Sequence, residues 1–373
     1  MELAIIVGII ITFFLSFILF TKKGKNLADK ILATWLVFVG IHLWLFYEHI
    51  LVHNYQYPAL LGVELPMPFL QWPFLYIYIK VLTNQYNPAK KWLLLLHFLP
   101  VISIYIYLID FFILSPAEKV FVFEHGGNVP KYASFTVTML VLMSISGLLY
   151  FLITYRLIKQ HRRNIVNQFS YQEKINLDWL QYLFVGMGLI WVVIWLRGND
   201  NLIFLSVVIF VIFLGYFGIK QVGIFTNRFP TEKELEETEI EIEKIKKYEK
   251  SSLTESAAVL IHTQLKTIME SERLYENPEL SLNDLAVYLN VHPNSLSQVI
   301  NTFEGKTFFD YINYHRVEAF KTMVKLPQNQ KYTLLALAYD CGFNSKTSFN
   351  RNFKKATGFA PSEYLKQLNI VLD

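Results

Sequence analysis

Near the C-terminus, a short stretch carries four positive charges on about three helical turns, with no acidic residue between them. Its candidate binding residues are Lys346, Thr347, Ser348, Arg351, Lys354 and Lys355. An arginine here can pair with two acceptors on the major-groove edge of a guanine, and neighbouring lysines suit phosphate oxygens. These residue types therefore predict contact with double-stranded DNA, with Arg351 at a base and Lys354 and Lys355 at the backbone.

A second set of polar side chains lies earlier in the chain and carries no charge. Its members, which have hydrogen-bonding side chains at helical spacing, are Asn294, Ser297, Gln298 and Asn301. Asparagine and glutamine can bond to both groups on the major-groove edge of an adenine, but uncharged side chains release few counterions from DNA. We therefore expect this stretch to contribute more to sequence preference than to affinity.

Each polar set belongs to an apolar pattern that is typical of a helix-turn-helix unit. In the first unit, Ser281 caps a helix whose apolar stripe leads through a short turn into a second stripe. These stripes consist of Leu282, Leu285, Ala286, Leu289, Leu296, Val299 and Ile300. The pattern recurs with Leu334, Leu337, Ala338, Cys341, Phe349 and Phe353, around a turn at Gly342 and Phe343. The sequence therefore predicts two copies of the unit in one domain.

The two units are joined by a predicted amphipathic helix from Phe308 to Leu326. A helix of this length spans roughly 28 Å at about 1.5 Å per residue. Two recognition helices held about 34 Å apart can enter successive major grooves on one face of a duplex. The connector therefore suits two units that bind the same DNA.

The stretch from Gly342 to Tyr364, GFNSKTSFNRNFKKATGFAPSEY, resembles the second helix-turn-helix unit of the AraC/XylS family of bacterial transcription regulators. The positions at the family's spacing are Gly342, Phe343, Ser345, Ser348, Phe349, Arg351, Phe353, Lys354, Gly358, Pro361 and Tyr364. The stretch LAVYLNVHPNSLSQVIN resembles the first unit through Leu285, Ala286, Leu289, Leu296, Ser297 and Ile300. The resemblance covers roughly residues 282–368 and departs from the family at Gln298 and Asn301, where Arg or His is common. It implies a sequence-specific regulator of transcription.

The remainder of the chain is too apolar for a soluble protein, since the sequence is 53% hydrophobic with a mean hydropathy of +0.33. Seven apolar runs have a length that can span a membrane. They are Leu3–Phe20, Ile31–Leu51, Leu65–Leu82, Trp92–Leu114, Ala133–Ile158, Leu177–Leu196 and Leu202–Ile219. The sequence therefore predicts an all-α protein: a seven-helix transmembrane bundle at residues 1–225, a charged helical linker at 226–260 and a double helix-turn-helix domain at 261–373.

The distribution of lysine and arginine predicts the orientation in the membrane, because cytoplasmic loops are enriched in both. If the N-terminus is outside, the inner loops hold 12 of these residues and the outer loops hold three. The first apolar run is followed by lysines, which is the reverse of the charge order in a signal peptide. We therefore expect a multi-pass protein of the bacterial inner membrane, with its DNA-binding domain in the cytoplasm.

Polar residues in the apolar runs give little support for other chemistry. His49 and His53 are one helical turn apart, which can suit a metal, but their aromatic neighbours favour a place at the membrane interface. Gln71 and His97 lie deeper, and they either line a ligand cavity or join helices by hydrogen bonds. The single cysteine, Cys341, is expected to be a small buried apolar residue. We therefore predict no enzyme activity and no metal or cofactor site.

Two functions remain open for the membrane part. In the first, the bundle senses a membrane or envelope ligand and changes the output of the DNA-binding domain. In the second, the bundle is a passive anchor or couples the regulator to a partner protein. The segment Thr231–Lys250 is predicted to be a charged helix with an apolar stripe of about two heptads, which favours a solvated spacer and a homodimer contact about equally.

Overall fold

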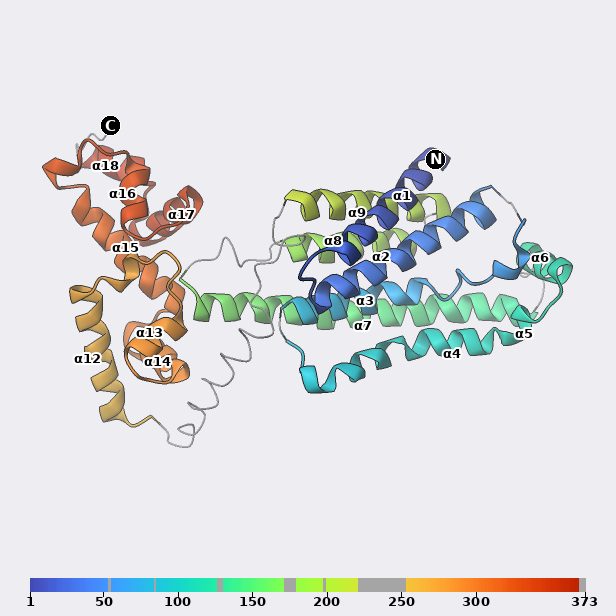
Figure 1. The fold of residues 1–373 in the computed structure, drawn as a ribbon, viewed down its shortest axis with the longest axis horizontal. Coiled ribbons are helices and arrows are strands. Elements are labelled where there is room, and N and C mark those ends of the chain that lie inside the picture. Colours follow the sequence, from blue (N-terminus) through green and yellow to red (C-terminus); the bar gives the residue numbers. More distant parts are fainter. Residues whose placement is uncertain are drawn as a thin grey trace. The chain divides into compact units, whose positions relative to one another are not determined.

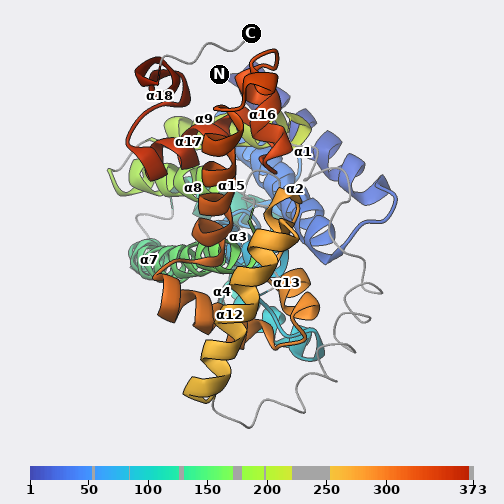
Figure 2. The ribbon, with the colours of Figure 1, turned by 90° about the vertical axis from the view of Figure 1, so that its left-hand side faces the viewer.

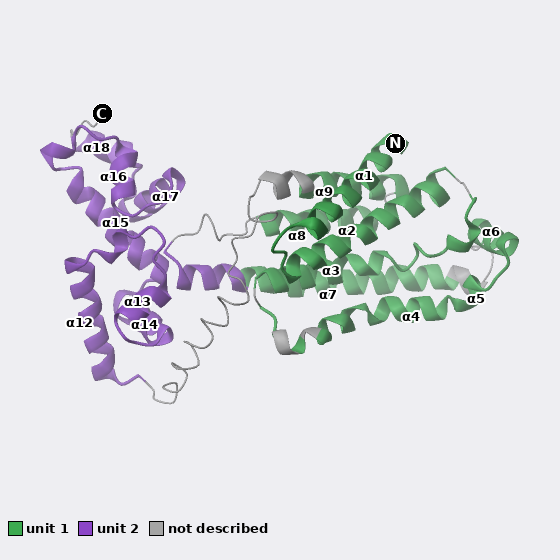
Figure 3. Cartoon of the chain, in the orientation of Figure 1, with its two compact units in different colours: residues 1–159, 178–229 green, residues 160–177, 230–373 purple. Residues whose placement is uncertain are grey.

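The computed structural model describes residues 1–52, 55–83, 85–125, 130–170, 179–196, 199–220 and 253–368. Within these ranges the chain forms helices and loops, with one isolated antiparallel bridge between Phe169 and Ser281. The chain divides into two compact units (Figure 3). Unit 1 comprises Met1–Lys159 and Asp178–Phe229, and unit 2 comprises Gln160–Leu177 and Pro230–Asp373. The prediction of a mainly helical protein is confirmed, whereas the predicted linker helix at Thr231–Lys250 lies outside the described residues.

Unit 1 is built from helices (Figure 1), several of which are strongly apolar in sequence. Its α-helices are α1 (Glu2–Thr21), α2 (Leu27–Phe46), α3 (Pro68–Leu82), α4 (Leu99–Tyr107), α5 (Ile109–Phe112), α6 (Pro116–His125), α7 (Pro130–Gln168), α8 (Trp179–Trp195) and α9 (Asp200–Lys220). A π-helical turn, η1 (Tyr47–Leu51), extends α2, and two 3-10 segments are η2 (Pro58–Leu60) and η3 (Pro88–Phe98). The last residues of α7, from Gln160 on, belong to unit 2.

Side-chain hydrogen bonds and close packing at a glycine hold the first helices of unit 1 together. Asn26 and Asp29 form a capping box that begins α2, and Asp29 also binds the Lys22 ammonium at 3.0 Å. The Ser16 hydroxyl donates to the carbonyl oxygen of Ala33 at 2.9 Å, which joins α1 to α2. A Cβ atom at Gly40 would lie 3.0 Å from the ring of Phe13. Small and polar residues therefore let these helices approach closely, as in helix pairs within membranes.

Three described helices are long and apolar enough to cross a membrane: Glu2–Thr21, Leu27–Leu51 and Ser134–Gln168. Three shorter apolar helices are Trp92–Tyr107, Trp179–Trp195 and Asp200–Leu214. All seven predicted runs contain helix, but the criterion of length and composition supports three spans and not seven. The helix of the third run has only 15 residues, because it begins at Pro68 and not at Leu65.

The fourth predicted run is not one continuous helix, so that prediction was wrong. The run begins in the 3-10 segment η3 and continues as α4 from Leu99, and α4 ends at Tyr107 before the short helix α5 begins at Ile109. The two deep polar residues of the sequence analysis join helices. The indole nitrogen of Trp35 donates to Gln71 at 2.8 Å, and a ring nitrogen of His97 lies 2.7 Å from the Tyr150 hydroxyl.

Unit 2 contains short helices around one longer helix. They are α12 (Glu255–Ser271), η5 (Leu274–Glu276), α13 (Leu282–Tyr288), α14 (Pro293–Val299), η6 (Ile300–Glu304), α15 (Phe308–Met323), η7 (Pro327–Asn329), α16 (Leu334–Asp340), α17 (Lys346–Thr357) and α18 (Pro361–Gln367). In Figures 1 and 2, α12 to α14 lie at one end of α15 and α16 to α18 at the other. The predicted boundary between residues 260 and 261 falls inside α12, whose cap is Thr254.

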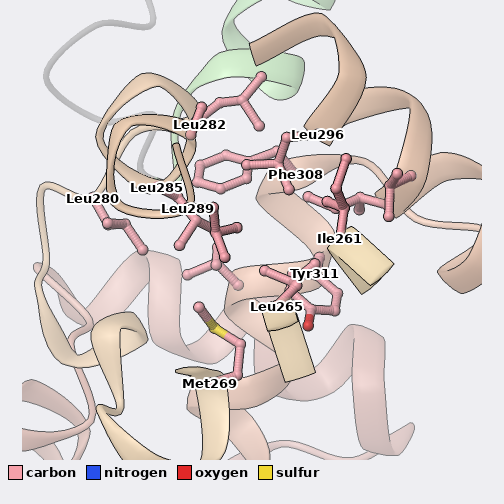
Figure 4. Packing of buried hydrophobic residues seen from close by; sticks show 14 of the residues in the cluster. Ile261, Leu265, Met269, Leu280, Leu282, Leu285, Leu289, Leu296, Phe308 and Tyr311 are labelled. Atoms are coloured by element: carbon pink, nitrogen blue, oxygen red, sulfur yellow. The ribbon is translucent and has the colours of Figure 1, made fainter. Parts of the chain in front are cut away.

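Helix α15 supplies side chains to two separate hydrophobic cores. Its first half contributes Phe308, Tyr311 and Ile312 to a core with α12, α13 and α14, part of which is drawn in Figure 4. Its second half contributes Val317 and Phe320 to a core with α16, α17 and α18. Helix α15 is therefore shared by the two helix-turn-helix units, because each half of it packs into the core of one unit.

Candidate nucleic-acid interface

The first helix-turn-helix unit is fixed by caps at the start of each helix. Ser281 and Asp284 form a capping box at α13, and Asn290 takes a left-handed conformation in the turn, with φ of 54°. Pro293 occupies the first turn of α14, where its missing N–H is no loss. The Nδ1 atom of His292 accepts the backbone N–H of Asn294 at 3.1 Å. These contacts fix where the recognition helix begins.

The polar residues of this first recognition helix lie at the surface of unit 2. Asn294, Gln298 and Asn301 are exposed, and Ser297 is half-buried. The Nδ2 atom of Asn301 donates to the carbonyl oxygen of Ser297 at 2.8 Å, so this amide group is partly used within its own helix. Asn301 lies in η6, the π-helical turn that continues α14. Asn294 and Gln298 therefore offer the more available amide groups of the set.

The second unit depends on a glycine in its turn. Gly342 has φ of +89°, a region in which side chains are strained. A Cβ atom there would overlap the carbonyl oxygen of Tyr275 and lie 2.8 Å from that of Glu276. The turn between α16 and α17 therefore packs directly against the backbone of η5, which leaves no room for a side chain.

Helix α17 is divided into a buried and an exposed face. Phe349 and Phe353 are fully buried, and the Phe349 ring lies 4.7 Å from that of Phe320 and 5.2 Å from that of Phe343. The exposed face, which carries polar and charged side chains, consists of Lys346, Thr347, Asn350, Arg351, Lys354 and Lys355. The aromatic core thus holds the polar face of α17 toward solvent.

One predicted DNA-contacting residue lies on the wrong side of α17. Ser348 is 3% exposed, and its hydroxyl oxygen accepts from Nδ2 of Asn352 at 3.3 Å. Its backbone N–H is bound by the Ser345 hydroxyl at 3.1 Å, which makes it part of the helix cap. Asn350, which the sequence analysis did not select, is exposed between Lys346 and Lys354. Its spacing of four residues from both lysines is the signal that could have identified it.

Two of the positive side chains on this face are held by α15. The Lys355 ammonium lies 2.6 Å from the Asp310 carboxylate, and the Arg351 guanidinium carbon lies 5.7 Å from the centre of the Phe309 ring. The absence of acidic residues within α17 had suggested four unopposed charges. An acid from another helix instead offsets Lys355. No described carboxylate lies within ion-pair distance of Lys346, Arg351 or Lys354.

A buried arginine links several segments of unit 2. Arg316 of α15 is 1% exposed and donates to the carbonyl oxygens of Tyr275 and Asn277, both at 2.7 Å. It also donates to the carbonyl and hydroxyl oxygens of Ser170, both at 3.1 Å. Burial lowers the pKa of Arg316 to about 9, so its guanidinium remains charged at neutral pH. Four oxygens from distant parts of the sequence thus satisfy one buried cation.

Cys341 is fully buried within the second core. Burial raises the pKa of its thiol to about 12, so the thiolate is scarce at neutral pH. Among the other candidates, His49 has its Nδ1 atom 3.3 Å from the Glu64 carboxylate, and His53 lies outside the described residues. Within the described ranges, no three His, Cys, Asp or Glu side chains group as metal ligands would.

Residues 285–367 match the family described as a helix-turn-helix domain. The chain is similar to YijO of Escherichia coli K12, described as an uncharacterized HTH-type transcriptional regulator, with 28% identity over 127 residues, 31% of this chain and 44% of that protein. It is also similar to RhrA of Rhizobium meliloti strain 1021, described as a transcriptional activator, with 28% identity over 103 residues, 27% of this chain and 32% of that protein.

The chain thus spans less than half of the length of these two relatives. A solved chain of unknown function from Listeria innocua is 28% identical and covers 29% of this chain and 95% of its own length, with a TM-score of 0.25. The match of residues 285–367 shows that the C-terminal part of this protein contains a helix-turn-helix domain.

Proposed function

We propose that this protein is a membrane-embedded, sequence-specific DNA-binding regulator of transcription. The main support for DNA binding is the exposed face of α17. Lys346, Arg351 and Lys354 point away from an aromatic core, and no described carboxylate pairs with them. The match of residues 285–367 to a helix-turn-helix domain and the descriptions of both relatives support the same function.

The two recognition helices divide the work of binding. On α17, Arg351 contacts a guanine and Lys354 a phosphate, because an exposed guanidinium suits two acceptors and an ammonium suits one charge. Lys355 contributes less because it already pairs with Asp310. On α14, Asn294 and Gln298 read base edges, with Ser297 and Asn301 in supporting positions. Ser348 is not among the contacts, since it is buried.

We further propose that unit 1 spans the inner membrane seven times, with the N-terminus outside and unit 2 in the cytoplasm. Three described helices have the length and composition of spans, and three shorter apolar helices together with α3 would supply the other four. Large apolar side chains such as Leu3, Phe17, Leu140 and Leu189 are exposed on these helices, which suits contact with lipid. The excess of lysine and arginine in alternate loops supports the orientation.

The test of DNA binding uses the full chain in lipid nanodiscs and a library of random duplexes. Selection and sequencing should yield one preferred motif with two half-sites about one helical turn apart. Arg351→Ala should relax the motif at one base pair, whereas Lys366→Ala, which removes an exposed lysine of α18, should retain the motif at every position. Equal recovery of all duplexes by the unmodified protein would refute sequence-specific binding.

The two proposed roles of unit 1, sensor and passive anchor, differ in what they require of Thr231–Lys250, which lies outside the described residues. Inserting two residues near Glu239 of a helix turns everything after it by about 200°, whereas seven residues return it to within about 20° of register. A sensor that signals through this segment, as a monomer or a homodimer, should lose regulation with two extra residues and keep it with seven. A passive anchor should tolerate both insertions, as measured by a reporter gene under the selected motif.

A further inference from the structure

Unit 1 contains an open, mainly apolar cavity with a buried carboxylate in its wall. The cavity has a volume of about 330 Å³ and is lined by side chains of α2, α3, α7, α8 and α9. Its walls include Leu43, Met143, Trp191 and Phe210. Glu64, in the segment before α3, belongs to the same wall and is only 4% exposed. A cavity of this size and composition falls in the range that holds a small ligand.

The Glu64 carboxylate is only half satisfied by the described residues. Its Oε1 atom lies 3.3 Å from Nδ1 of His49, itself 2% exposed, whereas Oε2 is buried without a hydrogen-bond partner. A carboxylate accepts hydrogen bonds through both oxygens, and a buried acceptor that lacks a donor costs stability. An acidic residue inside an apolar bundle is expensive and therefore marks a site more often than a packing position.

Among the other polar side chains of this wall, Asp200 is exposed, and Gln71 and His42 are half-buried. Gln71 accepts from Trp35 at 2.8 Å and donates to the carbonyl oxygen of Met67 at 3.4 Å. His42 packs edge-on against the Phe204 ring, with centroids 5.0 Å apart. Two further cavities of unit 1 have walls of apolar, hydroxyl and aromatic side chains without a carboxylate. Among the described lining residues, Glu64 Oε2 is thus the one buried side-chain atom that lacks a hydrogen-bond partner.

We infer that this cavity binds a small amphiphile, an apolar molecule whose single polar end is a hydroxyl or amino group that donates a hydrogen bond to Glu64 Oε2. The apolar walls accept the body of the ligand, and the Glu64–His49 pair selects the polar end. An ester, ether or hydrocarbon of the same length lacks a donor and leaves Oε2 unsatisfied. The inference names the ligand class of the proposed sensor and rests on that proposed function.

The experiment uses the full chain in nanodiscs and a photoreactive long-chain alcohol that carries an aliphatic diazirine. After illumination, mass spectrometry should find labelled peptides from α2, α8 and α9, which line the cavity. Unlabelled 1-decanol or decylamine should suppress this labelling at least tenfold more effectively than decane does. The stronger of the first two competitors shows whether the ligand is an alcohol or an amine. Equal competition by decane would overturn the requirement for a donor.

Two pairs of variants test whether the ligand binds in this cavity and whether its polar end contacts Glu64. Val207→Phe fills the cavity and should abolish labelling, whereas Ile212→Phe changes an exposed residue of the same helix and should not. Glu64→Met should remove the advantage of decanol over decane, whereas Glu118→Gln, at an exposed carboxyl of α6, should keep it. Unchanged labelling in Val207→Phe would overturn the proposed place. If that variant does not elute as a single species, the Glu64→Met comparison decides.

The same preparations separate this inference from the proposed function. Duplex selection depends on unit 2 and should succeed whether or not the cavity is occupied. A chain that binds its motif but shows no competition by decanol or decylamine overturns the ligand inference and leaves the DNA-binding proposal intact. A chain that selects no motif overturns the DNA-binding proposal.

Discussion

The Arg316 guanidinium lies 3.1 Å from both the carbonyl and the hydroxyl oxygen of Ser170, a residue far earlier in the sequence. Ser170 also donates through its backbone N–H and its hydroxyl to the carbonyl oxygen of Leu280, at 3.2 and 2.6 Å. Asn313 donates to the Ser170 carbonyl at 3.0 Å. Ser170, two residues after the end of α7, thus completes a polar cluster within unit 2.

This cluster predicts that a fragment of residues 251–373 folds but is less stable than the whole of unit 2. A peptide of residues 160–177, added to the fragment, should raise its melting temperature, because it restores acceptors for a buried arginine. The same peptide with Ser170→Pro, which removes the backbone donor and the hydroxyl, is the control and should have a much smaller effect. A melting temperature that neither peptide changes would mean that Ser170 contributes nothing to folding.

The exposed positions of α17 predict different losses for an arginine and a lysine. Arg351→Ala should reduce discrimination at one base pair by about 1 to 3 kcal/mol. Lys354→Ala should weaken binding to all sequences alike and reduce the slope of log affinity against log salt by about one unit. Fluorescence anisotropy with matched and mismatched duplexes at several salt concentrations measures both. Equal loss of discrimination in the two variants would refute the division of roles.

The pair between Lys355 and Asp310 predicts a variant that binds DNA more tightly. Asp310→Asn removes the carboxylate that lies 2.6 Å from the Lys355 ammonium and frees this charge for a phosphate. Affinity for all duplexes should rise, and the salt slope should steepen by up to about one unit. The double variant Asp310→Asn with Lys355→Ala is the control and should show no gain. The pair is partly exposed, so its loss should cost unit 2 little stability.

The packing of Gly342 predicts a severe effect of a single methyl group. Gly342→Ala forces a side chain into a left-handed conformation and against the backbone of η5, so unfolding should become easier by at least roughly 2 kcal/mol. Gly358 also has a positive φ of +82°, but nothing lies within 4 Å of a Cβ atom there. Gly358→Ala should therefore cost only about 1 kcal/mol. Urea denaturation of the two variants gives the comparison, and similar losses would refute the role of the close contact.

The sequence predicted most helices of unit 2 because local signals agree with the tertiary packing. Ser281 and Ser345 cap the helices where their patterns begin, and the stripes of Leu285 and Phe349 are buried as expected. The prediction that Ser348 contacts DNA was wrong because successive side chains of an α-helix point about 100° apart. Ser348 can therefore be buried although its neighbour Thr347 is exposed. The periodicity of apolar residues predicts which side chains of a helix face solvent only after the buried positions, here Phe349 and Phe353, have been identified.

Contacts between distant segments could not be predicted in this way. Nothing in the local sequence of Ser170 indicates that it meets Arg316, and α17 gives no sign that Asp310 opposes Lys355. In unit 1, hydrophobicity located apolar runs but not helix breaks, so the interruption at Leu108 was missed. Hydropathy averages over a window, whereas a break depends on the backbone of single residues.

The proposed orientation in the membrane predicts which cysteines an impermeant maleimide can reach in intact cells. Ala117→Cys, on α6 between two predicted spans, should be labelled from outside, whereas Asn164→Cys, near the end of α7, should react only after the cells are opened. The background is low because the native Cys341 is fully buried with a pKa of about 12, and Cys341→Ser removes it altogether. Both engineered positions are exposed, so a difference in labelling reports the membrane barrier and not burial in the protein. Labelling of Asn164→Cys in intact cells would overturn the orientation and the number of spans together, because residues 117 and 164 are separated by one apolar helix.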